Sequence, residues 1–204
     1  MKKFLSITSL ALVFAFAACK GNAPADLQGE KYPVASSSGT AYALDTASSV
    51  INWKGSKITG SHIGTVKVKS GEFYADGDKI TAGKFIIDMP TITDNDLEGE
   101  WKAKLEGHLK DTDFFEVGKY PEGLFEIASV TTTDSGYDVR GNLTLKGITK
   151  GIQFPASIQF EDKKPVSATG SVKINRQNWN IVYKGMPDDL ISDTIELELN
   201  LVTK

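Results

Sequence analysis

Apolar and polar residues alternate over most of the chain beyond about residue 40. The clearest case is the last segment, where every second residue is aliphatic: Ile195, Leu197, Leu199 and Leu201. Successive side chains of a strand point to opposite faces, so this period predicts strands with one buried and one exposed face. The same alternation recurs over residues 66–69, 138–145, 152–160 and 172–175. Turn signals such as Asp134-Ser135-Gly136 and Lys146-Gly147 separate the segments.

One segment follows a helical period instead. Four apolar residues stand four positions apart: Leu97, Trp101, Leu105 and Leu109. Asp94, Asn95 and Asp96 precede most of this stripe and are candidates for the helix N-cap. We therefore expect one amphipathic helix over residues 96–110, whose apolar stripe covers part of the sheet.

About eight long strands joined by short turns favour an all-β fold: a closed antiparallel barrel with the helix packed against it. Closure removes the edges that long strands would otherwise expose to other chains. A two-sheet sandwich is the alternative. Eight strands enclose an interior that side chains just fill or that holds one ligand. Alternation alone does not distinguish a solid barrel from a hollow one.

The N-terminus has the order of parts of a secretory signal. Two lysines precede an apolar stretch over residues 4–16, which is short for a membrane span, and Ala17-Ala18-Cys19 ends it. This ending resembles the lipobox of bacterial lipoproteins, with Phe16 where Leu is more usual. The resemblance implies that a signal peptide, residues 1–18, is removed and that Cys19 becomes the lipidated N-terminus. An ordinary secreted protein with a chance cysteine is the alternative.

Composition divides the rest of the chain. Residues 19–40 are rich in Gly, Ala, Pro and Ser, which predicts a lipidated cysteine and a flexible tether ahead of one domain over residues 41–204. The net charge is −3 without a basic cluster, which argues against nucleic acid as a partner. Cys19 is the only cysteine, so the domain has no disulfide and no thiol chemistry. Lys20 rather than Asp follows it, which resembles outer-membrane lipoproteins of Gram-negative bacteria. We expect an exported envelope lipoprotein that faces the periplasm from the outer membrane.

Several blocks of residues occur in the order found in YceI-like domains: Tyr42-x-Leu44-Asp45, Ser61-His62-x-Gly64-Thr65-Val66, His108-Leu109-Lys110-x-x-Asp113-Phe114-Phe115, Gly141-x-Leu143-Thr144-x-Lys146-Gly147 and Ile174-Asn175-Arg176-x-x-Trp179. The chain therefore resembles that family over essentially the whole domain. The resemblance implies a lipocalin-like barrel with a long apolar tunnel that binds an amphiphile. The expected ligand is a polyisoprenoid such as a quinone or a polyprenyl lipid. The resemblance implies no catalytic activity, no required cofactor and no metal.

Two groups of residues are predicted to form the ligand site. Inward positions on the strands would line the tunnel: Trp53, Phe85, Ile87, Phe125, Val139, Leu143, Phe154, Ile158, Val172, Leu197 and Leu199. A polar head group or a lid would involve His62, His108, Phe114, Phe115, Arg176 and Trp179. Ordinary core packing, fixed hydrogen bonds of the two histidines and a pairing of Arg176 with Asp113 or Asp193 are the alternatives.

We expect a membrane-anchored periplasmic binding protein that holds a long-chain amphiphile inside the barrel. No common enzyme signature is present in the sequence, so we do not predict an enzyme. One alternative is a hydrolase or isomerase that acts on such a lipid through His62 or His108, with Asp88, Glu106, Asp111 or Asp113 as carboxylate companion. The other is a solid-barrel envelope stress lipoprotein without ligand. Monomer and dimer both stay open.

Overall fold

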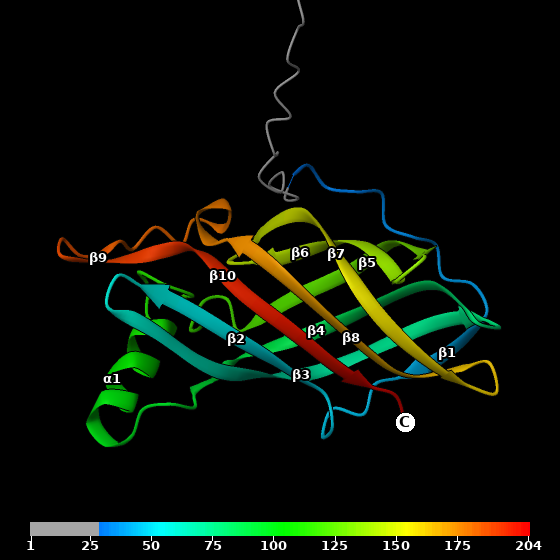
Figure 1. Ribbon diagram of the computed structural model, residues 1–204, viewed down its shortest axis with the longest axis horizontal. Helices are drawn as coiled ribbons and strands as arrows, with labels where there is room; N and C mark the ends of the chain where they lie inside the picture. The colour runs from blue at the N-terminus through cyan, green and yellow to red at the C-terminus, as the bar shows by residue number, and fades with distance from the viewer. Residues whose placement is uncertain (1–28) are drawn as a thin grey trace, which may run out of the picture.

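Eight long antiparallel strands close into a barrel in the computed structural model, which describes residues 29–204 (Figure 1). The strands are β2 (Val50–Lys57), β3 (Gly60–Asp76), β4 (Lys79–Asp94), β5 (Glu122–Thr133), β6 (Gly136–Leu145), β7 (Ile148–Glu161), β8 (Lys164–Asn175) and β10 (Asp189–Val202). Each strand pairs with two neighbours, and β3 bonds to both β2 and β4, so no edge of the barrel wall is left open. The predicted barrel is confirmed.

Tight turns join neighbouring strands. Lys146 and Gly147, between β6 and β7, both have positive φ, at 46° and 72°. Asp162 and Lys163, between β7 and β8, also have positive φ, at 48° and 64°. Positive φ at both central residues is the mark of the hairpin turns whose twist matches that of the flanking strands. The turn predicted from Lys146-Gly147 is confirmed. The turn at Asp162 and Lys163 contains no glycine, so the sequence gives no such signal for it.

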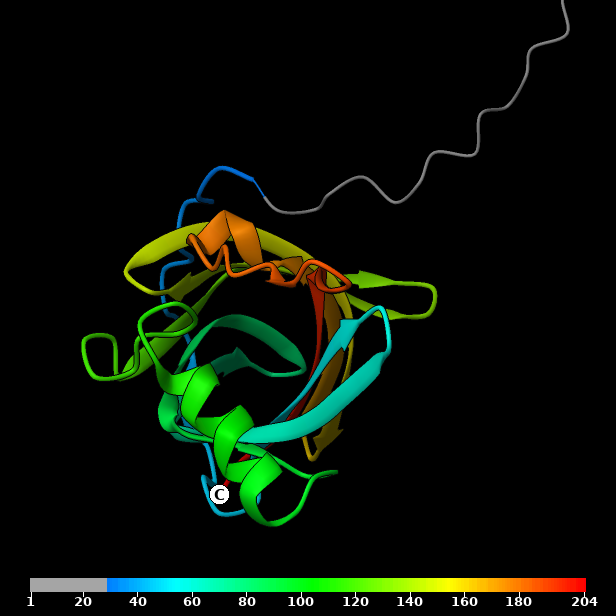
Figure 2. The same ribbon diagram turned by 90° about the vertical axis from the view of Figure 1, so that its left-hand side faces the viewer.

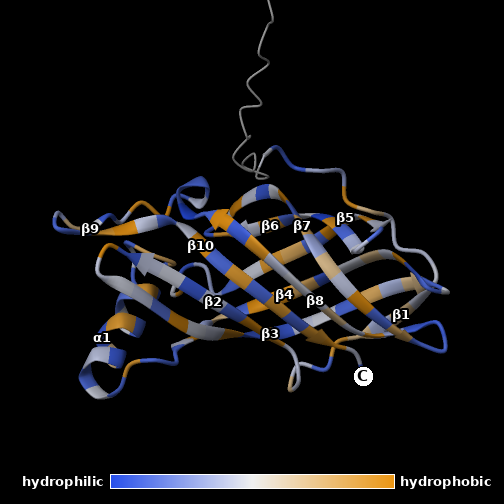
Figure 3. Ribbon diagram, viewed as in Figure 1, coloured by the Kyte–Doolittle hydropathy of each residue, from blue (hydrophilic) through white to orange (hydrophobic). Residues whose placement is uncertain are grey.

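The alternating apolar residues point into the barrel. Register places Leu199 opposite Ile51, and Phe125 opposite both Phe85 and Leu143. The rings of Phe85 and Phe125 lie 5.3 Å apart between centroids. Hydropathy changes along each strand with this period (Figure 3). The inner face of every strand thus contributes to one apolar interior.

The helix α1 (Gly99–Lys110) lies across one end of the barrel (Figure 2). It begins three residues later than the sequence predicts, because Asp94 caps a turn ahead of the helix. Its Oδ1 accepts hydrogen bonds from the backbone N–H groups of Asp96 and Leu97. The helix N-cap is Glu98, which makes no side-chain cap. Leu109 is the buried member of the stripe, whereas Trp101 is 70% exposed.

Three short elements complete the fold. They are β1 (Thr40–Ala43), the 3₁₀ helix η1 (Arg176–Trp179) and β9 (Gly185–Met186). The strand β1 pairs with the end of β3 that is distant from the helix, and β9 pairs with the start of β10. The loop that carries η1 and β9 therefore lies at the helix end of the barrel; Figure 1 shows β9 and α1 on opposite sides of that end.

Residues 29–39 lie along the outside of the barrel as a strap. The backbones of Gly29 and Gly151 exchange two hydrogen bonds, and the Ala35 N–H donates to the Ile127 carbonyl. The buried side chain of Asn142 accepts from the Tyr32 N–H and donates to the Tyr32 carbonyl. The sequence predicts a flexible tether over residues 19–40, and its part from residue 29 onward is bound to β5, β6 and β7 instead. The signal peptide, Cys19 and the start of the tether lie outside the described residues.

Leu199 and Glu198 test the register. Leu199→Asp should lower the free energy of unfolding by several kcal/mol, because it places a carboxylate in the apolar interior. Glu198→Lys should change it by about 0.5 kcal/mol or less, since that side chain is exposed and accepts one hydrogen bond from Asn52. Urea unfolding midpoints measure both. The opposite ranking would mean that β10 is shifted by one residue.

Candidate functional site

A central apolar cavity of about 100 Å³ occupies the barrel. Its wall includes eight of the predicted tunnel residues: Trp53, Phe85, Ile87, Leu143, Phe154, Val172, Leu197 and Leu199. Residues that the sequence did not single out also line it, among them Met89 and Ile92 of β4. Met89 continues the alternation of Phe85 and Ile87, which would have found it, whereas Ile92 lies beyond a register shift of β4 that the alternation does not predict. The barrel is hollow at its centre.

A second apolar cavity of about 40 Å³ lies toward the end that is distant from the helix. The other three predicted tunnel residues, Phe125, Val139 and Ile158, line it. Phe85 and Phe154 belong to both cavities. The ring of Phe125 lies between them, at 5.3 Å from Phe85 and 5.8 Å from Phe154. These three rings, here called the aromatic constriction, separate the central cavity from the far one.

A third pocket, of about 260 Å³, opens at the helix end and is here called the mouth pocket. It is bounded by β2, β3, α1 and the loop that carries β9. Trp53, Leu109 and Phe114 line both the mouth pocket and the central cavity. The three spaces therefore follow one another from the mouth to the far end.

Two residues that line the mouth pocket carry a buried nitrogen atom without a hydrogen-bond partner: Trp53 Nε1 and His108 Nε2. The Trp53 indole packs over Gly64, where a Cβ would collide with the ring and with the Thr93 carbonyl. His108 is held with its Nδ1 3.5 Å from Asp113 Oδ2 and its ring 4.4 Å from that of Tyr183. Buried polar atoms in folded proteins are nearly always bonded to protein or water, so these two call for a partner that the protein does not supply.

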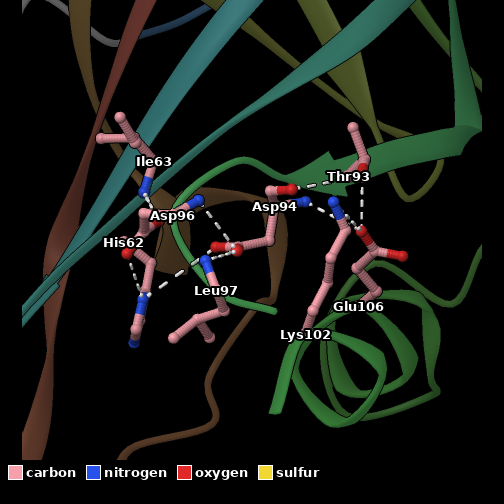
Figure 4. A network of polar contacts seen from close by, with 8 residues as sticks. All are labelled: His62, Ile63, Thr93, Asp94, Asp96, Leu97, Lys102 and Glu106. Atoms are coloured by element: carbon pink, nitrogen blue, oxygen red, sulfur yellow. Dashed lines mark hydrogen bonds and ion pairs between the residues drawn. The ribbon is translucent and has the colours of Figure 1, made fainter. Parts of the chain in front are cut away.

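His62 also lines the mouth pocket, and its companions are carboxylates that the sequence assigns to helix capping. Its Nδ1 lies 3.0 Å from Asp96 Oδ2 and 4.0 Å from Asp94 Oδ2 (Figure 4). Asp96 Oδ1 accepts from the Ile63 N–H at 2.8 Å. Burial raises the pKa of Asp96, but the bonds from the Ile63 N–H and His62 outweigh it and hold that pKa below its ordinary value. The candidate companion Asp113 stands beside His108 instead.

Arg176 is 1% exposed and braces the wall at the helix end. Its guanidinium donates to the carbonyls of Ser192, Ile181 and Ile191, and it pairs with Asp193 at 3.2 Å. Burial lowers the pKa of this guanidinium, and the charge of Asp193 opposes the shift. The pairing with Asp193 that the alternative expects is present. Arg176 also lines the central cavity, and its head-group role stays a prediction.

Trp179 is fully buried and donates its indole N–H to the Leu143 carbonyl at 3.1 Å. Its predicted head-group role does not fit this position, because its polar atom already has a partner inside the wall. Phe114 and Phe115 pack edge to face, 5.2 Å apart between centroids, and both line the central cavity. They form part of the wall at the helix end, as the alternative of ordinary core packing expects.

Exposed apolar side chains surround the mouth pocket. Those on the β2–β3 hairpin, α1 and the loop that ends in β10 are Ile58, Ile63, Trp101, Val182, Met186 and Leu190, here called the rim. No helix among residues 29–204 is both long and apolar enough to cross a membrane.

Comparisons with known proteins agree with this architecture. A family model described as a YceI-like domain matches residues 42–203. A UPF0312 protein of Pseudomonas putida is 36% identical over 160 residues, which cover 74% of this chain and 78% of that protein. A UPF0312 protein of Pseudomonas fluorescens is 29% identical over the same coverage.

Two solved structures share the fold. BcnA of Burkholderia cenocepacia superposes with a TM-score of 0.65 at 20% identity, covering 79% of this chain and 99% of that one. A polyisoprenoid binding domain from Saccharophagus degradans superposes with a TM-score of 0.55 at 18% identity, covering 80% of this chain and 97% of that one.

Proposed function

The chain belongs to the YceI-like family, and we propose that it is a binding protein that holds a polyisoprenoid or another long-chain amphiphile in its barrel. One observation carries the proposal. The interior is apolar from the mouth to the far end. Among residues 29–204, the three buried side-chain polar atoms without a hydrogen-bond partner all stand near the mouth, on Trp53, Asp94 and His108.

This distribution sets the orientation of the ligand. An apolar chain gains about 0.8 kcal/mol for each CH₂ group that leaves water, and the walls of the central cavity offer almost no polar surface to oppose it. A polar head group loses its hydration unless it finds partners. The mouth pocket offers the Trp53 N–H as a donor and His108 Nε2 as either donor or acceptor. The head therefore lies at the mouth and the tail along the barrel.

The aromatic constriction limits how far the tail reaches. A volume of about 100 Å³ is small beside the roughly 300–1,000 Å³ of typical ligand pockets, so the central cavity alone takes a short chain segment. A longer tail extends into the mouth pocket or displaces the rings of Phe85 and Phe154 to enter the far cavity. The Saccharophagus degradans domain with the same fold is described as polyisoprenoid binding, which supports this class of tail.

We also propose that the chain is exported and anchored in the outer membrane, facing the periplasm, through lipidated Cys19. The signal-like N-terminus and the small-small-Cys ending support this. The ten residues from Cys19 to the strap span at most about 35 Å when extended, so an anchored barrel stays close to the bilayer. The apolar rim would then face a membrane from which an amphiphile can enter the mouth pocket.

Filling the central cavity should remove the ligand without unfolding the protein. Val172→Phe places a phenyl ring in that cavity, whereas Ser171→Phe places the same ring on the outer face of β8. Solvent extraction and mass spectrometry of the purified variants should find a stoichiometric amphiphile with Ser171→Phe and with the wild type, and little or none with Val172→Phe. Thermal unfolding should change little for Val172→Phe. Equal lipid content in all three proteins would place the ligand outside the barrel.

Removing the Trp53 N–H should remove head-group selectivity. The wild type should bind farnesol more tightly than the hydrocarbon farnesene in a fluorescent-probe displacement assay. Trp53→Phe should weaken farnesol binding about fivefold, the value of one net hydrogen bond, and leave farnesene nearly unchanged. Trp179→Phe is the matched control, because its lost N–H bonds to Leu143 and not to a ligand; it should lower stability and keep the selectivity. Unchanged selectivity in Trp53→Phe would refute this head-group role.

Cys19→Ser should abolish lipidation and leave the chain unprocessed or released from the membrane. Metabolic labelling with a radioactive fatty acid measures this directly. Incorporation equal to that of the wild type would rule out the proposed anchor.

A hydrolase or isomerase is the alternative that one observation favours. His108 lines the mouth pocket with its Nδ1 near Asp113 and its Nε2 unpaired, a pairing of histidine and carboxylate that general bases use. Incubating the extracted lipid with wild type, His62→Ala and His108→Ala distinguishes the two functions. A binding protein leaves the lipid chemically unchanged in every case. Conversion by the wild type that a histidine variant loses would establish the enzyme.

A further inference from the structure

Asp94 presents a buried oxygen atom that the protein leaves without a partner. The side chain is 0% exposed, and its Oδ2 accepts no hydrogen bond. The other oxygen, Oδ1, is held by the N–H groups of Asp96 and Leu97, so the carboxylate cannot rotate without breaking two bonds. Leaving a buried carboxylate oxygen unpaired is costly, and such an atom in a native protein calls for a physical reason.

Two further ligand atoms face this oxygen. His62 Nδ1 lies 4.0 Å from it and 3.0 Å from Asp96 Oδ2, and all three atoms lie within 4.8 Å of one another (Figure 4). Asp96 repeats the arrangement of Asp94, since its Oδ1 is held by the Ile63 N–H and its Oδ2 points to the histidine. In each carboxylate, one oxygen therefore accepts hydrogen bonds from the backbone and the other faces His62 Nδ1.

Lys102, on the neighbouring helix, pairs with Glu106 at 3.8 Å. Glu106 is itself occupied by the Thr93 hydroxyl and the Asp94 N–H, bonds that hold its pKa below the ordinary value. Its carboxylate fixes the backbone of Asp94 from the side opposite to His62. The backbone and Glu106 therefore supply an outer shell that orients the ligand atoms.

The geometry points to a divalent-cation site formed by His62 Nδ1, Asp94 Oδ2 and Asp96 Oδ2. Ligand atoms of tetrahedral zinc at roughly 2.0–2.2 Å from the metal stand roughly 3.3–3.6 Å apart. This separation falls between the distances from His62 Nδ1 to Asp96 Oδ2 and to Asp94 Oδ2, which are 3.0 and 4.0 Å. One imidazole and two carboxylates form a donor set for a first-row divalent ion such as Zn²⁺ or Mn²⁺. His62 and Asp96 are 28% and 33% exposed, so the ion has a path from solvent and water completes its coordination.

This inference is independent of the proposed ligand, because it concerns the cation and three side chains alone. Isothermal titration of the full-length chain in non-ionic detergent with ZnCl₂, and separately with MnCl₂, tests it. We expect saturable binding of one ion per chain for at least one of the two metals. Asp94→Asn and His62→Ala should weaken that binding at least about tenfold, as even outer-shell changes do so. Cys19→Ser serves as background, since it removes the only thiol.

Asp88→Asn is the matched control, because Asp88 lies on the same strand outside the cluster; it should bind the metal as the wild type does. Thermal unfolding gives a second readout. Excess Zn²⁺ over EDTA should raise the Tm of the wild type and leave that of Asp94→Asn unchanged. In EDTA, Asp94→Asn should be at least as stable as the wild type, because it loses a buried unpaired charge. Should that variant fail to fold, the more exposed Asp96→Asn replaces it.

Several results would overturn the site. They are the absence of saturable binding of either metal, equal affinity in the wild type and in both aspartate variants, and binding that disappears with Cys19→Ser alone. The first would leave an ion pair between a protonated His62 and the aspartates as the reason for the cluster.

Discussion

Closure of the sheet is the constraint on which the rest of the structure depends. Because β3 bonds to both β2 and β4, half the side chains of eight strands point into one enclosed space. That space has no water to satisfy polar groups, so the inward positions must be apolar. It also has a fixed radius, set by the number of strands, and side chains of ordinary size do not fill it everywhere. An apolar cavity follows from the architecture rather than from any single residue.

Polar chemistry is therefore confined to the place where the barrel ends. At the mouth, α1 and the η1–β9 loop approach the strands obliquely, and buried polar atoms there need partners from different elements. Some are supplied: the Arg176 guanidinium spans from η1 to β10, and the Trp179 indole reaches a carbonyl of β6. Others are not, as at Trp53, Asp94 and His108. The bonded residues hold the mouth of the barrel together, whereas the unpaired ones lack a partner within the protein.

The sequence predicts the parts of this arrangement that depend on local pattern. Period-two alternation around Leu199 is a property of neighbouring residues, and all eleven predicted tunnel residues line a cavity. Contacts between distant residues are beyond such a pattern. The sequence pattern places Asn142 on the outward, polar face of its strand. In the structure Tyr32, 110 positions away, covers it. Asp94 and Asp96 read as helix caps because their local spacing suits one, whereas their second oxygens face a histidine from another strand.

The identity of the inward residues does not show whether a barrel is solid or hollow, and the aromatic constriction shows why. Phe85, Phe125 and Phe154 are the residues that a solid core would use, and here they fill one cross-section of the barrel while the sections on either side stay open. Gly141 stands beside Phe125 because a Cβ there would collide with that ring. A small residue next to a large ring therefore marks a packed layer, not a free slot. The open central cavity is lined by aliphatic side chains such as Val172 together with the edges of several rings. Under the proposed function, whether the ligand tail passes the packed layer depends on how readily the three rings move apart, so the constriction would set the length of chain that the barrel holds.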